Sequence, residues 1–325
     1  MGNQETNENW QGINIKGGEV TINNPVSNYG EKSHKKHKPN LTEQELKELY
    51  CHFLQQIQVK YQELKLFHTQ DKVKLQDQYI PIQVTLERQF THEIETIRNY
   101  GIFDLDSTDA YAIKGIKEET KTVKVDWGEA KKDHEKIMVL ADPGMGKSTL
   151  LKNETVIKVK EELENIENRL INDVVFPLFI RWSELAREQG EIIDIIPNIL
   201  IKDYPKIIDK IEYYLQKKLE QGKCLLLLDA LDEVPKDDRI SLTKKINRFL
   251  SNYPCQVICT SRIVGYAGNF IDGGKEVEIV PFDDEKTADY IKTWFNHAAD
   301  QRLVATLSIY SPQQEVVSAH LFHCL

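Results

Sequence analysis

The chain has 325 residues and a formal net charge of −9, from 42 Lys and Arg against 51 Asp and Glu. This length is typical of about two domains and is ample for a hydrophobic core. Hydrophobic residues at 40% and charged residues at 29% exclude a chain that is disordered throughout, and the acidic balance argues against a dedicated nucleic-acid-binding protein.

Residues 1–40 are expected to form a flexible leader. Aliphatic residues alternate at period two on either side of Gly17-Gly18, which predicts a small β-hairpin. An isolated hairpin is marginally stable in water, so we expect it to pair with another copy or to stay loose. The basic run at residues 32–38 is interpreted as a solvated linker, with a phosphate-contacting arm as the alternative.

Residues 41–130 are expected to form a helical N-terminal and linker region. A helix is predicted to begin after Thr42, because Thr42 and Glu45 have the spacing of a capping box. Apolar residues then recur at helical spacing in one stripe, which must pack on a second helix, on the main domain or on another chain. The stripe consists of Leu46, Leu49, Tyr50, Phe53, Leu54, Ile57 and Tyr61. Residues 75–82 are predicted to be extended and to end near a proline.

The segment 131–300 alternates short apolar runs with helical patterns. This alternation predicts an α/β fold with a parallel sheet that is covered by helices on both faces. The expected strands are residues 137–140, 176–180, 225–228, 256–260 and 277–280. Helices are expected from Lys147 onward, over residues 208–219 with Gly222 beyond the end, and over residues 240–250.

A glycine-rich loop follows the first expected strand and opens a helix, and it matches the phosphate-binding loop pattern with Ala in place of the first Gly. Gly144 and Gly146 allow backbone N–H groups to approach phosphate oxygens, and the helix dipole favours an anion there. Lys147 is expected to contact the β- and γ-phosphates, and Ser148 to offer its hydroxyl to Mg²⁺. The expected nucleotide-binding residues are Ala141, Asp142, Pro143, Gly144, Met145, Gly146, Lys147, Ser148 and Thr149.

Acidic residues follow the strand at 225–228. Asp229 stands at its carboxyl end, where ligands bind in open α/β sheets, and is expected to hold Mg²⁺ together with Ser148. Asp232 and Glu233 follow within one turn and are expected to orient or deprotonate the attacking water. Arg262 ends another buried strand and is expected to sense the γ-phosphate. The structural alternatives are a helix cap for the acids and, for Arg262, a surface arginine that caps the strand.

These motifs, in this order, resemble a NACHT domain, the P-loop module of signal-transduction NTPases of the STAND class. That class includes animal innate-immune receptors and many bacterial proteins. The resemblance rests on Asp142 to Thr149, Leu228 to Glu233 and Thr260 to Arg262, and it covers roughly residues 75–300. A small residue after the Mg²⁺ aspartate, here Ala230, is characteristic of the family, whereas related AAA+ enzymes tend to place Glu there.

The resemblance implies that the protein binds ATP and Mg²⁺ and hydrolyses ATP slowly, as a switch. It also implies a role in bacterial stress sensing or anti-phage defence, in which ATP-driven self-association activates an N-terminal effector. The alternative is a truncated, hydrolysis-deficient nucleotide-binding or interaction module. A motor-type ATPase is disfavoured, because no Glu directly follows Asp229. ATP is favoured over GTP by the resemblance, and no Asn-Lys-x-Asp motif for guanine is evident.

Family members continue into helical and winged-helix domains. Residues 301–325 are therefore expected to be an incomplete remnant of a helical domain, so that the chain would be a fragment without a full lid over the nucleotide and with fast ADP exchange. His320, His323 and Cys324 lack an evident fourth ligand and are not expected to bind a metal, and the same holds for His34 with His37.

The sequence contains no apolar run near the ~20 residues that a membrane helix needs, and its polar N-terminus has no signal-peptide core. We therefore expect a cytoplasmic protein without a membrane partner. The five cysteines have no paired spacing and are expected to be buried free thiols.

Overall fold

The structure is a computed structural model, and the residues that it describes are 9–10, 13–16, 19–22, 39–65, 72–86, 123–166, 168, 171–268 and 270–295. The chain divides into two compact units, Met1–Lys38 and Pro39–Leu325, and each is described by itself. The basic run at residues 32–38, both sets of histidines discussed above and the C-terminal segment 301–325 lie outside the described residues.

The described part of the first unit is a small antiparallel sheet of β1 (Asn9–Trp10), β2 (Ile13–Lys16) and β3 (Glu19–Ile22). Ile13 lies opposite Ile22 and Ile15 opposite Val20. The period-two alternation therefore predicted the hairpin correctly, with both strands in the expected places.

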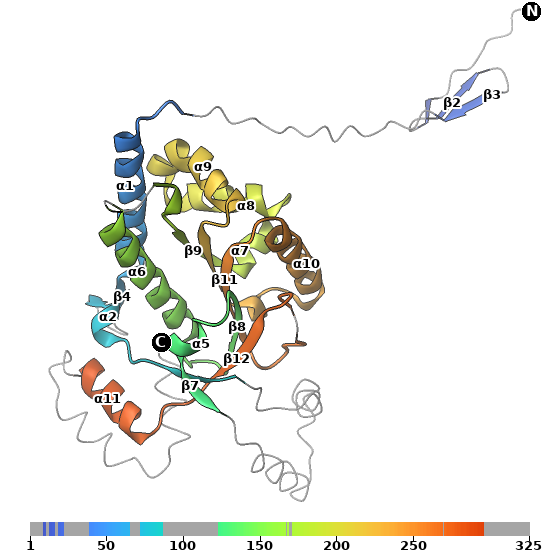
Figure 1. Cartoon of the computed structure of the whole chain (residues 1–325). Coiled ribbons are helices and arrows are strands. Elements are labelled where there is room, and N and C mark those ends of the chain that lie inside the picture. The colour runs from blue at the N-terminus through green and yellow to red at the C-terminus, as the bar shows by residue number, and fades with distance from the viewer. Residues whose placement is uncertain are drawn as a thin grey trace, which may run out of the picture. The chain divides into compact units, whose positions relative to one another are not determined.

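A mixed sheet forms the centre of the second unit. Among the described residues it has seven strands in the order β7-β6-β12-β8-β11-β10-β9. Figure 1 labels β7, β8, β9, β11 and β12 of this sheet. Within the series β12-β8-β11-β10-β9, each strand is parallel to the next. Each overlaps one of the expected apolar segments, so the predicted parallel sheet is confirmed. Their bounds are Lys136–Ala141 for β8, Phe176–Arg181 for β9, Cys224–Asp229 for β10, Gln256–Arg262 for β11 and Lys275–Ile279 for β12.

One edge of the sheet departs from the expected all-parallel arrangement. The strands β6 (Gln83–Thr85) and β7 (Lys124–Asp126) add to β12 as antiparallel strands. The prediction of an extended segment over residues 75–82 was wrong for its first half, where α2 (Leu75–Gln78) forms one helical turn. Leu75 and Gln78 are three positions apart and are both buried, a spacing that one turn of helix places on the same side.

Helices cover both faces of the parallel strands, as predicted. Parallel crossovers are right-handed, so the direction in which a crossover runs along the sheet decides which face its helix covers. The crossover from β8 to β9, which contains α6 (Lys147–Asn165), runs in the opposite direction to the later crossovers. Leu150 and Leu151 of α6 therefore pack on the face that carries Val139 and Leu227, together with α5 (Trp127–Ala130). The opposite face packs against α7 (Trp182–Arg187), α8 (Ile192–Asp203), α9 (Pro205–Glu220) and α10 (Lys236–Asn252). The last described helix is α11 (Asp284–Phe295).

The helix α1 (Glu43–Tyr61) packs on the main domain, which is one of the three possibilities left open by its apolar stripe. The predicted capping box is present, since the Glu45 N–H donates to Thr42 Oγ1 at 3.2 Å and the Thr42 N–H donates to Glu45 Oε2 at 2.8 Å. Tyr50 and Phe53 contact the ring of Phe176 in β9, with centroid distances of 4.8 and 5.2 Å. In Figure 1, α1 runs beside α6. A short hairpin of β4 (Glu63–Lys65) and β5 (Lys72–Lys74) follows.

Three of the cysteines, Cys224, Cys255 and Cys259, are buried free thiols as expected, whereas Cys51 is only partly buried. Burial raises the pKa of the Cys259 thiol well above its ordinary value. No group of three or more possible metal-ligating side chains occurs in the part of the chain that the structure describes. Within the same residues, no helix combines the length and the apolar character needed to cross a bilayer.

A buried lysine joins α9 to the start of β9. Lys218 is 2% exposed, and its ammonium donates to the carbonyl oxygens of Ile171, Asn172 and Val174 at 2.7, 2.9 and 2.8 Å. We expect Lys218→Met to lower the free energy of unfolding by about 2 kcal/mol, because three carbonyls lose their partner. Urea unfolding measures this. The neighbouring Lys217→Met is the control, since Lys217 makes a surface ion pair with Glu220; equal effects of the two substitutions would contradict the assignment.

Candidate functional site

The glycine-rich loop connects β8 to α6 at the carboxyl edge of the sheet. Gly144 and Gly146 have φ angles of 79° and 78°, in the left-handed region that glycine adopts without strain. Gly146 is the N-cap residue of α6. No side chain caps the start of this helix by a hydrogen bond, and its first turn contains no acidic residue. The first N–H groups of α6 are therefore available to an anion, which the helix dipole also favours.

Lys147 lies over this loop. Its Nζ donates to the carbonyl oxygens of Ala141 at 2.8 Å and of Asp142 at 3.0 Å. Burial lowers the pKa of the Lys147 ammonium, and the nearby carboxylate of Asp232 opposes that shift. The ammonium thus stays at the mouth of the loop with acceptors that phosphate oxygens can replace.

The second half of the site is a carboxylate between two hydroxyls. Asp229, at the end of β10, is 5% exposed. Ser148 Oγ donates to its Oδ2 at 2.7 Å, and Thr260 Oγ1 at the end of β11 donates to its Oδ1 at 2.7 Å. The predicted pair of Ser148 and Asp229 is therefore brought into contact, although the two residues are 81 positions apart in the chain.

This donor set suits a hard divalent cation. A serine hydroxyl and a carboxylate are oxygen ligands of the kind that Mg²⁺ selects, and Mg²⁺ commonly keeps water and phosphate oxygens at its other positions. The residues present therefore fit the Mg²⁺ ion that this type of loop implies. Sequence reasoning did not assign a role to Thr260, whose hydroxyl orients Asp229 from the neighbouring strand. The signal that could have found it is a hydroxyl residue at the carboxyl end of that strand.

Backbone strain lies directly beside this carboxylate. Ala230 has φ 60° and ψ 64°, and among the described residues it is the one non-glycine residue with a positive φ. A left-handed conformation costs an L-residue roughly 1–2 kcal/mol. The Ala230 N–H donates to Thr260 Oγ1 at 2.9 Å, which ties the strained residue to the same hydroxyl that holds Asp229. A small side chain limits the cost of this turn.

Two of the expected catalytic residues form an ion pair. The Arg262 backbone N–H donates to Asp232 Oδ1 at 3.0 Å, and Arg262 Nε lies 2.8 Å from Asp232 Oδ2. The Asp232 side chain is 11% exposed, whereas that of Arg262 is 52% exposed. The sequence placed both residues at this edge of the sheet but did not indicate that they bind each other. Glu233 has an exposed side chain without a hydrogen bond to the described residues.

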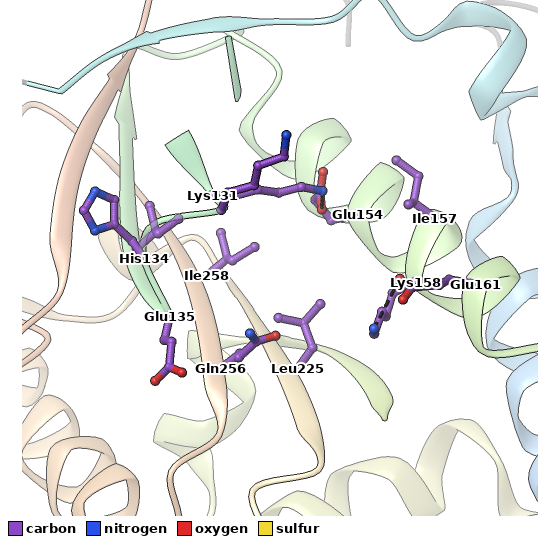
Figure 2. A pocket seen from close by; sticks show the side chains of 12 residues that line it. Lys131, His134, Glu135, Glu154, Ile157, Lys158, Glu161, Leu225, Gln256 and Ile258 are labelled. Atoms are coloured by element: carbon purple, nitrogen blue, oxygen red, sulfur yellow. Dashed lines mark hydrogen bonds and ion pairs between the residues drawn. The ribbon is translucent and has the colours of Figure 1, made fainter. Parts of the chain in front are cut away.

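A separate pocket of about 270 Å³ lies at the amino ends of the strands, on the face covered by α6 (Figure 2). Its apolar lining consists of Ile137, Ile157, Leu225 and Ile258. Its rim is charged, and Lys131 pairs with Glu154 at 2.8 Å. Because β8, β10 and β11 are parallel, this pocket is at the end of the sheet opposite Lys147 and Asp229 and is not part of the site described above.

The comparisons with known proteins place the site in a recognised domain. Residues 135–298 match the sequence model of the NACHT domain. This segment holds half of the chain and contains the glycine-rich loop, Asp229 and the Asp232–Arg262 pair. A search of curated proteins found no match.

Proposed function

This chain belongs to the NACHT-domain family of P-loop NTPases and is therefore a nucleotide-binding protein of that class, and from this premise we propose that it is a switch that binds Mg·ATP and hydrolyses it slowly. The observation that carries the proposal is the 2.7 Å contact between Ser148 and Asp229. It joins the phosphate-binding loop to the acidic end of β10, so that one site offers both anion-binding N–H groups and Mg²⁺ ligands.

In this proposal, each group of the site has a separate role. The N–H groups at the start of α6 and the ammonium of Lys147 hold the phosphates, and Ser148 and Asp229 hold Mg²⁺. An Mg²⁺ ion held by these two residues would supply positive charge to neutralise the phosphates. Asp232 orients the attacking water once Arg262 turns from its carboxylate toward the γ-phosphate. Glu233 has a secondary role, because its side chain is exposed.

The wider role is proposed from the resemblance of the motifs. The protein is a cytoplasmic signal-transduction NTPase of the STAND class, from a bacterium, that acts in stress sensing or anti-phage defence and self-associates with ATP. The domain arrangement that we propose is the one expected from the sequence: a leader over residues 1–40, a helical region over residues 41–130 and the NTPase domain over residues 131–300. The proposal that the protein binds Mg·ATP does not depend on this wider role, because it rests on the geometry of the site.

One observation favours a second candidate, a nucleotide-binding module that does not hydrolyse. Both oxygens of the Asp232 carboxylate are occupied by Arg262. If this pair persists with ATP bound, the Asp232 carboxylate is not free to orient water. The two candidates share the nucleotide site and differ only in turnover.

Single-turnover hydrolysis of radiolabelled ATP separates these candidates. We expect Asp232→Asn to slow hydrolysis at least about tenfold, since general-base or water-orienting groups contribute at least that much, and to change nucleotide affinity by less than about twofold. Glu233→Gln should also slow hydrolysis, by a smaller factor than Asp232→Asn. The control is Glu129→Gln, an exposed carboxylate on α5. Turnover of the unmodified protein at the rate of buffer alone would favour the non-hydrolysing module.

A further inference from the structure

A buried arginine behind the site has no assigned role. Arg239 lies in the first turn of α10 and is 9% exposed. Its guanidinium donates to three backbone carbonyls: Nη2 to Asp232 at 2.6 Å, Nε to Val234 at 2.7 Å and Nη1 to Gly265 at 3.1 Å. A buried cation is costly unless hydrogen bonds compensate it, and these three acceptors are all main-chain oxygens.

The three acceptors belong to the two loops that carry the ion pair. Asp232 and Val234 follow β10, whereas Gly265 follows Arg262 at the end of β11. Gly265 has a φ angle of 81°, a left-handed conformation. The rigid fork of a guanidinium suits this task, because its N–H groups point in fixed directions toward separate acceptors.

Asp232 is therefore held at two points. Its carbonyl oxygen accepts from Arg239, and its carboxylate accepts from Arg262. When Arg262 leaves the carboxylate, the contact with Arg239 still fixes the backbone of Asp232. The freed carboxylate then stays near Lys147 instead of moving away with Arg262.

We propose that Arg239 is a positioning residue that locks the loops after β10 and β11 together and thereby sets where Asp232 and Arg262 stand beside the phosphates. It acts through these two residues and does not itself contact nucleotide. This inference rests on the proposed function for its effect on hydrolysis, whereas the locking of the two loops is a property of the protein alone.

The test compares Arg239→Gln and Arg239→Lys with the unmodified protein. Hydrogen exchange should increase in residues 230–235 and 262–266 in both variants, and it should stay unchanged in the glycine-rich loop. The dissociation constant of fluorescent Mg·ADP should change by less than about twofold, while single-turnover hydrolysis falls about tenfold. Arg239→Lys should not rescue the rate, because one ammonium cannot reproduce the fork. The matched control is Arg248→Gln on the same helix, where Arg248 makes an exposed ion pair with Glu191.

A double variant tests whether Arg239 acts through Asp232. If it does, Asp232→Asn combined with Arg239→Gln should hydrolyse ATP no more slowly than Asp232→Asn alone, since residues that work as one unit are not additive. Additive losses would overturn the proposal, and so would unchanged exchange in both loops. If the unmodified protein shows no hydrolysis, the proposed function fails while the exchange measurement still decides on the locking role.

A second variant keeps the test decisive if Arg239 substitutions unfold the protein. Gly265→Ala strains the left-handed backbone, and the new Cβ would lie 3.8 Å from Arg239 Nη1, an ordinary contact. We expect the same pattern of exchange and kinetics from this change, without removal of a buried charge. A folded Gly265→Ala variant with normal exchange in residues 262–266 and normal hydrolysis would contradict the inference.

Discussion

Replacement of Asp229 by Asn should lower the affinity for Mg·ATP about a hundredfold, because groups that merely support metal ligands already contribute about 10–100-fold and Asp229 is proposed as a direct ligand. The amide keeps the shape of the side chain but removes its negative charge. The affinity for ATP without Mg²⁺ should stay close to that of the unmodified protein, since Lys147 and the start of α6 are untouched.

Fluorescence anisotropy with a labelled ATP analogue, with Mg²⁺ or with EDTA, measures both affinities. Asp232→Asn is the matched control, because it changes a carboxylate of the same site that is paired with Arg262. Asp229 also accepts from Ser148 and Thr260, so a thermal unfolding curve is needed for each variant. If both substitutions lowered Mg·ATP binding equally in folded proteins, Asp229 would not be the Mg²⁺ ligand.

Lys147→Ala should weaken Mg·ATP binding about a hundredfold as well, through the phosphates instead of the metal. Lys147 now donates to two carbonyl oxygens, and two phosphate contacts can replace them. Hydrogen bonds that involve a charged group contribute about 1.5–3 kcal/mol each, and about 1.4 kcal/mol corresponds to a tenfold change in affinity. In contrast to Asp229→Asn, this loss should persist in EDTA.

The pH dependence provides an internal check on Lys147. Phosphate binds the protonated ammonium, and burial has lowered the pKa of this group from its ordinary 10.5. The affinity of the unmodified protein should therefore fall as the pH rises through the lowered pKa, and the fall should begin at a lower pH than for an exposed lysine. Lys147→Ala should lack this step. Identical titration curves for the two proteins, at neutral pH or across the alkaline range, would sink the assignment.

The parts of the site that could be predicted from the sequence are those formed by contiguous residues. The phosphate-binding loop has a fixed spacing of Gly144, Gly146 and Lys147, and the four leucines before Asp229 identify a buried strand. Parallel strands then bring their carboxyl ends to one edge of the sheet. These two facts were enough to expect that Ser148 and Asp229 lie at one Mg²⁺ site, and the structure brings the two side chains into contact.

The remaining features depend on contacts between segments that carry no pattern of their own. The strands β6 and β7 have three residues each, too few for a period to be read. The Asp232–Arg262 pair depends on the conformation of the chain at the ends of β10 and β11. The positive φ of Ala230 has no signal in the amino-acid composition. The sequence predicts nothing special for Arg239, which looks like a polar residue on the surface of a helix. Its acceptors are backbone oxygens, which the sequence does not reveal.

A calorimetric titration of ATP into the unmodified chain, with Mg²⁺ and then with EDTA, tests most directly whether the glycine-rich loop and Asp229 form one Mg·ATP site. We predict saturable binding of one ATP per chain, tighter with Mg²⁺ than with EDTA, and a preformed site should require little change in the fold. The absence of saturable heat, or the same affinity with and without Mg²⁺, would contradict the account.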